Sequence, residues 1–139
     1  MIILDTNVLS ELMRAKPHAR VTAWLKSVAA SDAYTTSMCE SEIFYGVELL
    51  PAGKRRAELE ATAIALFEID FAGRVLAFDS AAARAFGEVA AGRRQAGRPI
   101  GELDAQIAAI ARTHSATLAT RDVRDFAGCG IAVVSPWMQ

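Results

Sequence analysis

Short apolar runs alternate with longer stretches of helical periodicity along nearly the whole chain. We expect strands at Met1–Leu4, Ala33–Thr36, Val75–Phe78, Thr117–Ala119 and Ile131–Val134. Between them, helices are expected near Asn7–Arg14, Arg20–Ala29, Cys39–Leu49, Lys54–Phe67, Ser80–Gly97, Glu102–Arg112 and Val123–Phe126. This rhythm predicts an α/β fold in which helices cover both faces of a mostly parallel sheet.

The length of 139 residues suits one domain, and we place its bounds at residues 1–139 because no linker interrupts the pattern. The longest apolar runs, such as Ile107–Ala111, are too short to cross a bilayer. The first apolar run is preceded by no basic region and is ended by Asp5, so it does not read as a signal peptide. The two cysteines form no motif with the two histidines, which favours a reduced, cytoplasmic protein without structural zinc.

Two acids stand directly after expected strands. Asp5 follows Met1–Leu4, and Asp122 follows the run that ends at Arg121. In open parallel sheets, ligands collect beyond the carboxyl ends of the strands, so both acids are candidates for one crevice. Each also has an ordinary explanation as the N-cap of the helix that follows it.

Two further acids lie on expected helices, each on a stripe that we expect to face inward. One stripe has the spacing i, i+3, i+4, i+7 and comprises Glu42, Tyr45, Gly46 and Leu49. The other comprises Asp104, Ile107, Ala108 and Ala111. A buried, unpaired carboxylate is costly, which argues for a role beyond stability, although first-turn acids also favour the helix dipole. The capping-box spacing of Ser37 and Glu40 places the start of the helix that carries Glu42.

If the four acids converge, they form an oxygen-rich site of the kind that binds a hard divalent cation. Such a donor set suits Mg²⁺ or Mn²⁺, whereas Zn²⁺ favours His and Cys ligands. We expect Asp5 and Asp104 to bind metal directly, and Glu42 and Asp122 to hold a second ion or metal-bound water. Thr120 is expected to position substrate or water, with Thr6 and Asn7 fixing the loop after the first strand.

Four motifs, in this order and spacing, resemble the PIN-domain ribonucleases and in particular the VapC toxins. Met1–Val8 looks like the opening strand and first acid of that family, and Ser41–Gly46 is similar to its second acidic motif. Asp104–Ala109 resembles the third and Leu118–Asp122 the fourth, while Ser135–Trp137 is most similar to the FitB-type subgroup. Leu103 departs from the pattern, because family members often carry a smaller residue there.

The resemblance implies a three-layer α/β/α PIN-like domain. It also implies an Mg²⁺- or Mn²⁺-dependent endoribonuclease, a hydrolase of ester bonds, that serves as the toxin of a type II toxin–antitoxin pair. Its expected partners are an RNA substrate, a small DNA-binding antitoxin that inhibits it, and a second copy in a homodimer. Operator DNA would be met only through the antitoxin, and no membrane is expected.

The formal net charge of −1 excludes a generally basic nucleic-acid binder, but it leaves room for a local basic rim. Candidate clusters are Arg14, Lys16 and Arg20; Lys54, Arg55 and Arg56; and Arg93, Arg94 and Arg98. Each cluster could equally be ordinary solvated helix surface. Trp24, Phe44 and Tyr45 are expected in the core, with a groove for an antitoxin helix as the second option, and His114 is interpreted as structural.

Two other functions compete with the nuclease. A phosphatase of the haloacid-dehalogenase type would use Asp5 as nucleophile, but it needs an acid two residues later, where Asn7 stands. A catalytically silent interaction module would keep the fold and bind only a partner. The presence of all four acids argues against loss of activity. RNA cleavage that depends on added metal would separate the nuclease from both alternatives.

Overall fold

The computed structural model describes residues 1–139 and contains one five-stranded, wholly parallel sheet in the order β3-β2-β1-β4-β5. The strands are β1 (Ile2–Leu4), β2 (Ala33–Thr36), β3 (Val75–Leu76), β4 (Thr117–Ala119) and β5 (Ala132–Val134). All five expected strands are present. The third is shorter than expected, because Val75 and Leu76 pair with Thr35 and Thr36, where β2 ends.

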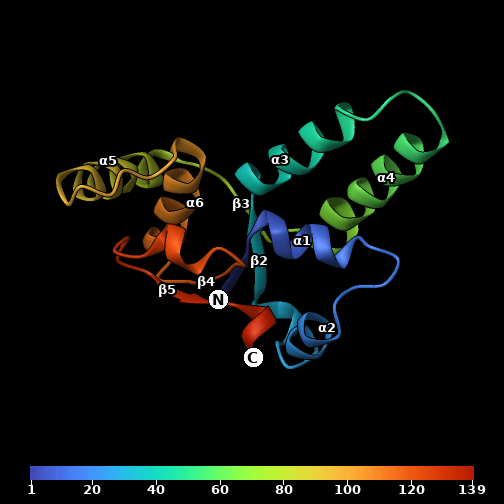
Figure 1. Ribbon diagram of the computed structural model, residues 1–139, viewed down its shortest axis with the longest axis horizontal. Coiled ribbons are helices and arrows are strands. Elements are labelled where there is room, and N and C mark those ends of the chain that lie inside the picture. Colours follow the sequence, from blue (N-terminus) through green and yellow to red (C-terminus); the bar gives the residue numbers. More distant parts are fainter.

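Six α-helices lie on both sides of the sheet (Figure 1), which confirms the α/β/α fold class. They are α1 (Thr6–Leu12), α2 (Ala19–Lys26), α3 (Ser37–Glu48), α4 (Lys54–Ala65), α5 (Ser80–Gln95) and α6 (Glu102–Thr113). Short helical segments are η1 (Ala30–Asp32), η2 (Leu66–Asp70), η3 (Val123–Phe126) and η4 (Pro136–Met138). None of these helices has the length and apolar character needed to cross a membrane.

The sheet is buried at its centre. Ile3, Leu4 and Leu118 of the neighbouring strands β1 and β4 are fully buried, as expected for parallel strands covered on both faces. From β1 the chain moves outward to β2 and β3, and then crosses to the opposite side of β1 to form β4 and β5. The direction of winding therefore reverses between β1 and β4, which is the position where open α/β sheets bind ligands.

Helix α3 differs from the expectation in its start and in its buried face. Its N-cap is Thr36, whose hydroxyl accepts the Cys39 N–H at 3.1 Å, so the predicted capping box at Ser37 is wrong. The buried stripe is formed by Cys39, Ile43 and Val47.

The face of α3 that carries Glu42 therefore lies beside the core and not within it. Tyr45 and Leu49 are both 67% exposed. Successive side chains of an α-helix are rotated by about 100° around its axis, so the stripe with Glu42 points away from the core when the neighbouring stripe is buried. Trp24 and Phe44 do pack against the core, but the core prediction is wrong for Tyr45. An apolar face on α3 is thus left without cover from this chain.

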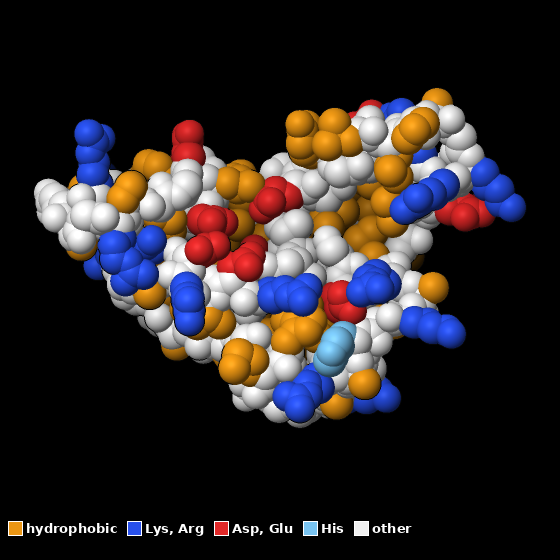
Figure 2. All heavy atoms as spheres, viewed as in Figure 1, with side chains coloured by type: hydrophobic (Ala, Val, Ile, Leu, Met, Phe, Trp, Pro, Cys, Tyr) orange, Lys and Arg blue, Asp and Glu red, His pale blue; other side chains and the backbone are white.

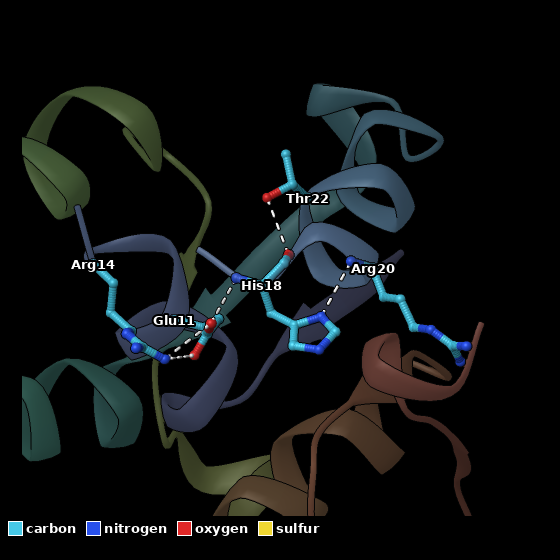
Figure 3. A network of polar contacts seen from close by, with 5 residues as sticks. All are labelled: Glu11, Arg14, His18, Arg20 and Thr22. Atoms are coloured by element: carbon cyan, nitrogen blue, oxygen red, sulfur yellow. Dashed lines mark hydrogen bonds and ion pairs between the residues drawn. The ribbon is translucent and has the colours of Figure 1, made fainter. Parts of the chain in front are cut away.

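The junction between α1 and α2 is held by the carboxylate of Glu11, which is buried (Figure 3). Its Oε1 accepts the His18 N–H at 2.7 Å, and its Oε2 forms an ion pair with Arg14 at 3.2 Å. The His18 N–H is the main cause that lowers the pKa of Glu11, and Arg14 adds to it. His18 then caps α2 by accepting the Arg20 N–H at 3.1 Å. This network fixes the start of α2 and so the position of Arg20.

Candidate active site

Asp5 lies at the carboxyl end of β1 and is also the N-cap of α1. The residue is 95% buried, and in its carboxylate Oδ1 accepts the Thr6 N–H at 2.8 Å and Oδ2 accepts the Thr120 hydroxyl at 2.7 Å. The backbone N–H of Asp5 also donates to the Ala119 carbonyl at 2.9 Å, which continues the β1–β4 ladder by one step. Asp5 is thus the N-cap of α1 and also joins the carboxyl ends of β1 and β4.

The buried hydroxyl of Thr120 connects Asp5 to Asp122. Besides donating to Asp5, it accepts hydrogen bonds from the Asn7 side-chain amide at 3.2 Å and from the Asp122 N–H at 3.1 Å. The Asn7 amide nitrogen also lies 3.1 Å from Oδ2 of Asp122, and its amide oxygen accepts the Arg121 N–H at 3.1 Å. The expected supporting role of Asn7 therefore has a definite form, which is to fix the backbone and carboxylate that follow β4.

Glu42 reaches the same site from α3. It is half-buried, and one of its carboxylate oxygens accepts the Thr6 hydroxyl at 2.7 Å. Burial raises the pKa of Glu42, the hydrogen bond from Thr6 opposes that shift, and the charge of Asp5 adds to it. Thr6 therefore links Asp5 to Glu42 through its backbone and its side chain, a connection across 36 residues that sequence periodicity does not reveal.

Asp104 occupies the first turn of α6, whose N-terminus lies at the carboxyl edge of the sheet. Its carboxylate makes no hydrogen bond and no ion pair with the chain. Burial raises the pKa of Asp104 to about 6, with further contributions from the charges of Asp5, Asp125, Glu42 and Asp122. The five carboxylates therefore act on a common region at this edge of the sheet.

Asp125 is the acid that sequence reasoning missed as a member of this region. It lies in η3, three residues after Asp122, and lines a hollow of about 260 Å³ together with Asp104 and Arg93. The three-residue spacing of Asp122 and Asp125 could have indicated that both acids lie at this edge of the sheet. In a helix with three residues per turn, residues three apart lie on the same side.

The acidic centre is defined as Asp5, Glu42, Asp104, Asp122 and Asp125. None of the four ion pairs in the molecule includes one of these acids. Burial also raises the pKa of Asp5, against the hydrogen bonds from Thr120 and Thr6. The centre is thus a concentration of like charge in which hydrogen bonds fix the carboxylates of Asp5, Glu42 and Asp122. Figure 2 shows acidic side chains gathered in the middle of one face.

The donor set of the centre fits a hard divalent cation. It offers only carboxylate and hydroxyl oxygens, and a bound cation would relieve the mutual repulsion of the acids. No three His, Cys, Asp or Glu side chains converge closely enough to form a ready-made metal cage. Mg²⁺ commonly uses one or two carboxylates and keeps several waters, so a wet, partly formed site is compatible with it. Which acids ligate directly stays a prediction.

Cys39 is the one potential nucleophile next to the centre. Its sulfur lies 3.8 Å from Oδ1 of Asp5 and is fully buried. Burial, together with the charge of Asp5, raises the pKa of the Cys39 thiol to about 12. The thiol thus stays protonated at neutral pH and serves as a weak donor to Asp5.

A groove begins at Thr6 and Glu42 and runs between α1, α3 and α4. Its cavity volume is about 230 Å³, and its walls include Met13, Ile43, Gly46, Val47, Leu50 and Leu59, with Arg55 beside them. A Cβ added at Gly46 would meet nothing within 4 Å, so the wall of the groove is open at this point. In Figure 2 an apolar hollow lies beside the acidic side chains.

Four residues of the predicted basic clusters, Arg14, Lys54, Arg56 and Arg93, have partners within the chain. Arg14 pairs with Glu11, Lys54 with Glu58 at 3.8 Å, and Arg56 with Glu48. Arg93 is 92% buried, so both predictions for it, a basic rim and solvated helix surface, are wrong. Its guanidinium donates to the carbonyls of Arg98 and Asp125, both at 2.7 Å, and thereby holds η3 against the end of α5.

The PIN domain family model matches residues 2–128 of the chain, which include all five acids of the centre. The chain belongs to the PIN-domain family. The toxin FitB of Neisseria gonorrhoeae is 40% identical over 99% of both chains. The VapC ribonuclease Y4jK of Sinorhizobium fredii is 37% identical over 99% of this chain and 98% of its own.

Solved structures agree with this assignment. FitAB bound to a DNA fragment matches with a TM-score of 0.92 and 39% identity, covering 99% of this chain and 96% of the other. FitAcB from Neisseria gonorrhoeae matches with a TM-score of 0.90 and 38% identity over the whole of both chains. The family and the PIN-like fold predicted from the sequence are confirmed, and the names of the relatives bear out the prediction of a ribonuclease toxin. The match also removes the phosphatase alternative.

Proposed function

We propose that this PIN-domain protein is a metal-dependent endoribonuclease, the toxin of a toxin–antitoxin pair, with its active site at the acidic centre. The observation that supports the proposal is that Asp5, Glu42, Asp104 and Asp122 come from four separate elements to the region around the switch point of the sheet, where the charges of the other three help to raise the pKa of Asp104. Relatives named as toxin and ribonuclease cover 99% of the chain, which supports the same activity.

The chain's own residues would act mainly by positioning. Asp5 is fixed by Thr6 and Thr120, and Glu42 is fixed by Thr6, so neither carboxylate needs reorganisation when a ligand arrives. Asp5, Glu42, Asp104 and Asp122 would hold Mg²⁺ or Mn²⁺, with Asp5 and Asp104 ligating directly. Such an ion would supply Lewis-acid chemistry, which would make a bound water more acidic, polarise the phosphate and shield RNA from the acids. Hydrolysis would add water across one P–O bond of the RNA backbone.

The groove next to the centre is the proposed binding site of the antitoxin. Its wall and the adjacent α3 surface are apolar, with Tyr45 and Leu49 exposed beside it. Amphipathic helices commonly bind in such grooves through residues spaced three and four apart. Because the groove opens at Thr6 and Glu42, a segment seated in it would also block access to the acidic centre. The solved FitAB and FitAcB complexes support a toxin–antitoxin assembly for this chain.

Operator DNA would be reached through the antitoxin, as suggested by the FitAB structure bound to DNA. A homodimer remains a prediction from the family resemblance. A catalytically silent module is the remaining alternative, and it differs from the proposal in one measurable property. A silent module would bind the antitoxin and leave RNA intact under all conditions.

The test uses the chain purified free of antitoxin and a labelled single-stranded RNA. We expect cleavage with Mg²⁺ or Mn²⁺, none with EDTA, and restoration when metal is returned. Asp5→Asn should lower the rate at least about 100-fold, because metal assistance supplies several kcal/mol. Adding antitoxin should suppress the wild-type rate. Metal-independent cleavage, or Asp5→Asn cleavage at the wild-type rate, would exclude the proposed site.

A further inference from the structure

Two arginines next to the acidic centre were in none of the basic clusters that the sequence suggested. Arg121 immediately precedes Asp122, and Arg124 lies in η3 between Asp122 and Asp125. Both side chains are exposed, and neither forms an ion pair with an acid. In Figure 2, Lys and Arg side chains border the acidic group on the same face. Uncompensated cations thus stand directly beside the centre.

The guanidinium of Arg121 is held by an aromatic ring and not by a carboxylate. Its central carbon lies 5.1 Å from the centroid of the Trp137 ring, in cation–π geometry. A carboxylate partner would fix the side chain and also cancel its charge. A ring fixes it and leaves the full positive charge available to an incoming anion. Arg121 is therefore an oriented cation that has no anionic partner within the chain.

The backbone of Arg121 is anchored to the centre itself. Its N–H donates to Asn7 at 3.1 Å, and the other end of the same amide contacts Asp122. The backbone of Trp137 is contacted by Arg20 of α2, whose guanidinium donates to the Trp137 carbonyl at 3.5 Å. The arginine–tryptophan patch, defined as Arg20, Arg121, Arg124 and Trp137, thus joins α2, the end of β4 and η4 into one surface beside the centre.

We propose that the arginine–tryptophan patch binds the phosphates of the RNA backbone next to the phosphodiester that is cut. This inference rests on the proposed ribonuclease function and adds the path of the substrate to it. RNA must approach five acids on a chain of net charge −1, so fixed cations beside the centre would lower the repulsion before and after metal binds. Planar guanidinium groups suit phosphate oxygens through paired N–H donors.

Arg121 follows β4, whereas Glu42, where the apolar groove begins, belongs to α3, which follows β2 on the other side of β1. The groove has the composition of a protein-binding surface, whereas the patch has that of a phosphate-binding surface. The proposed antitoxin and the substrate would then use different surfaces and compete at the acidic centre.

The binding test uses a single-stranded RNA oligonucleotide and the Asp104→Asn chain with Mg²⁺, so that cleavage does not consume the probe. Fluorescence anisotropy is measured over a range of salt concentrations. Arg121→Gln should weaken binding roughly five- to tenfold and reduce the salt slope by about 0.7, the value for one lost contact to single-stranded phosphate. Arg124→Gln should act in the same direction, and Arg121→Lys should lose less than Arg121→Gln.

Arg112→Gln is the matched control. It removes the same charge, but Arg112 pairs with Glu88 near the far end of α6, away from the carboxyl edge of the sheet. We expect less than a twofold change in RNA affinity. Because Arg121 also contacts Trp137, thermal unfolding checks that each variant is folded, and the exposed Arg124 supplies a second variant. In the active chain, Arg121→Gln should raise KM more than it lowers kcat.

Two results would overturn the proposal for the patch alone. In the first, the unsubstituted chain cuts RNA while Arg121→Gln and Arg124→Gln bind it with unchanged affinity and salt slope. In the second, the Arg112 control loses as much affinity as they do. A loss of antitoxin inhibition with full RNA affinity would assign the patch to the protein partner instead. If the unsubstituted chain neither binds nor cuts RNA, the ribonuclease proposal fails first.

Discussion

The acidic centre and the apolar groove meet at Thr6 and Glu42, yet they are built in opposite ways. The centre concentrates carboxylates that form no ion pairs, and hydrogen bonds fix three of them, Asp5, Glu42 and Asp122. The groove has almost no fixed polar contacts and leaves Tyr45 and Leu49 exposed beside it. Each region is unfavourable for the chain alone, the centre through charge repulsion and the groove through exposed apolar surface. Each is therefore suited to a different ligand, a cation with RNA or a protein segment.

The largest expected effect on RNA cleavage comes from substituting Glu42, the acid that α3 contributes to the centre. Glu42→Gln keeps the size of the side chain and the Thr6 contact but removes the charge, and we expect cleavage to fall about 100-fold. Glu40→Gln is the control, since it removes the same charge from the same helix outside the centre. The measurement is the initial rate of RNA cleavage with saturating metal. Equal losses in the two variants would show that the charge of the helix matters and not the position of Glu42.

The converse change fills the groove and leaves the centre intact. Gly46→Glu places a charged side chain in open space on the groove wall, so it should fold normally. We expect antitoxin affinity to fall roughly 10- to 100-fold, as for a charge introduced into a buried apolar interface. RNA cleavage by the free chain should keep its wild-type rate.

Gly46→Ala separates the charge from the loss of glycine. It should retain antitoxin binding and gain up to about 1 kcal/mol of stability, because alanine is the better helix former and its methyl group meets nothing. Calorimetric titration with antitoxin gives the affinities, and denaturant unfolding gives the stabilities. Unchanged affinity in Gly46→Glu would place the antitoxin elsewhere on the molecule.

A smaller effect is expected inside the hydrogen-bonded part of the centre. Thr120→Val keeps the shape of the side chain but removes the hydroxyl shared by Asp5, Asn7 and Asp122. We expect roughly tenfold slower cleavage and about 1–3 kcal/mol lower stability, since buried polar partners lose their contacts. Thr120→Ser retains the hydroxyl and should recover most of the rate. A Val variant with the wild-type rate would limit Thr120 to a structural role.

The contrast between the two regions also explains what could be predicted from the sequence. Asp5 and Asp122 were placed well because a residue that follows a buried strand lies at the edge of a parallel sheet whatever the rest of the fold does. Asp104 was placed by its helical period. These arguments use only local spacing, and the strand bounds at Ala33–Thr36 and Thr117–Ala119 followed in the same way.

What could not be predicted depends on contacts between distant segments. The bond from Thr6 to Glu42 joins residues 36 apart, and that from Thr120 to Asp5 joins residues 115 apart. The prediction of which face of α3 is buried was wrong. Cys39, Ile43 and Val47 form an apolar stripe beside the one that contains Glu42, and only tertiary packing decides which stripe is buried. The burial of Arg93 could not be predicted, because the carbonyl of Asp125 that accepts its hydrogen bond is brought to it only by the tertiary fold.

The smallest expected effect concerns the stability of the centre without metal. The pKa of Asp104 is raised from 3.8 to about 6, so the folded chain binds this proton more tightly than the unfolded chain does. The stability of the metal-free protein should therefore fall as pH rises from about 4 to 6, and the full penalty remains above pH 6. Asp104→Asn removes that penalty. Because the side chain is half-exposed, solvent screening reduces the expected gain to about 1 kcal/mol, or about 3 °C in Tm.

Thermal unfolding in EDTA at pH 7.5 and at pH 4 measures this gain directly. Asp104→Asn should be the more stable protein at pH 7.5, and the difference should vanish at pH 4, where the wild-type carboxyl is protonated. Asp32→Asn, an exposed acid in η1, should change neither value. A gain that persists at pH 4 would mean that packing and not charge repulsion is relieved. A gain confined to high pH and abolished by added Mg²⁺ would show that the acidic centre gives up stability until a cation is bound.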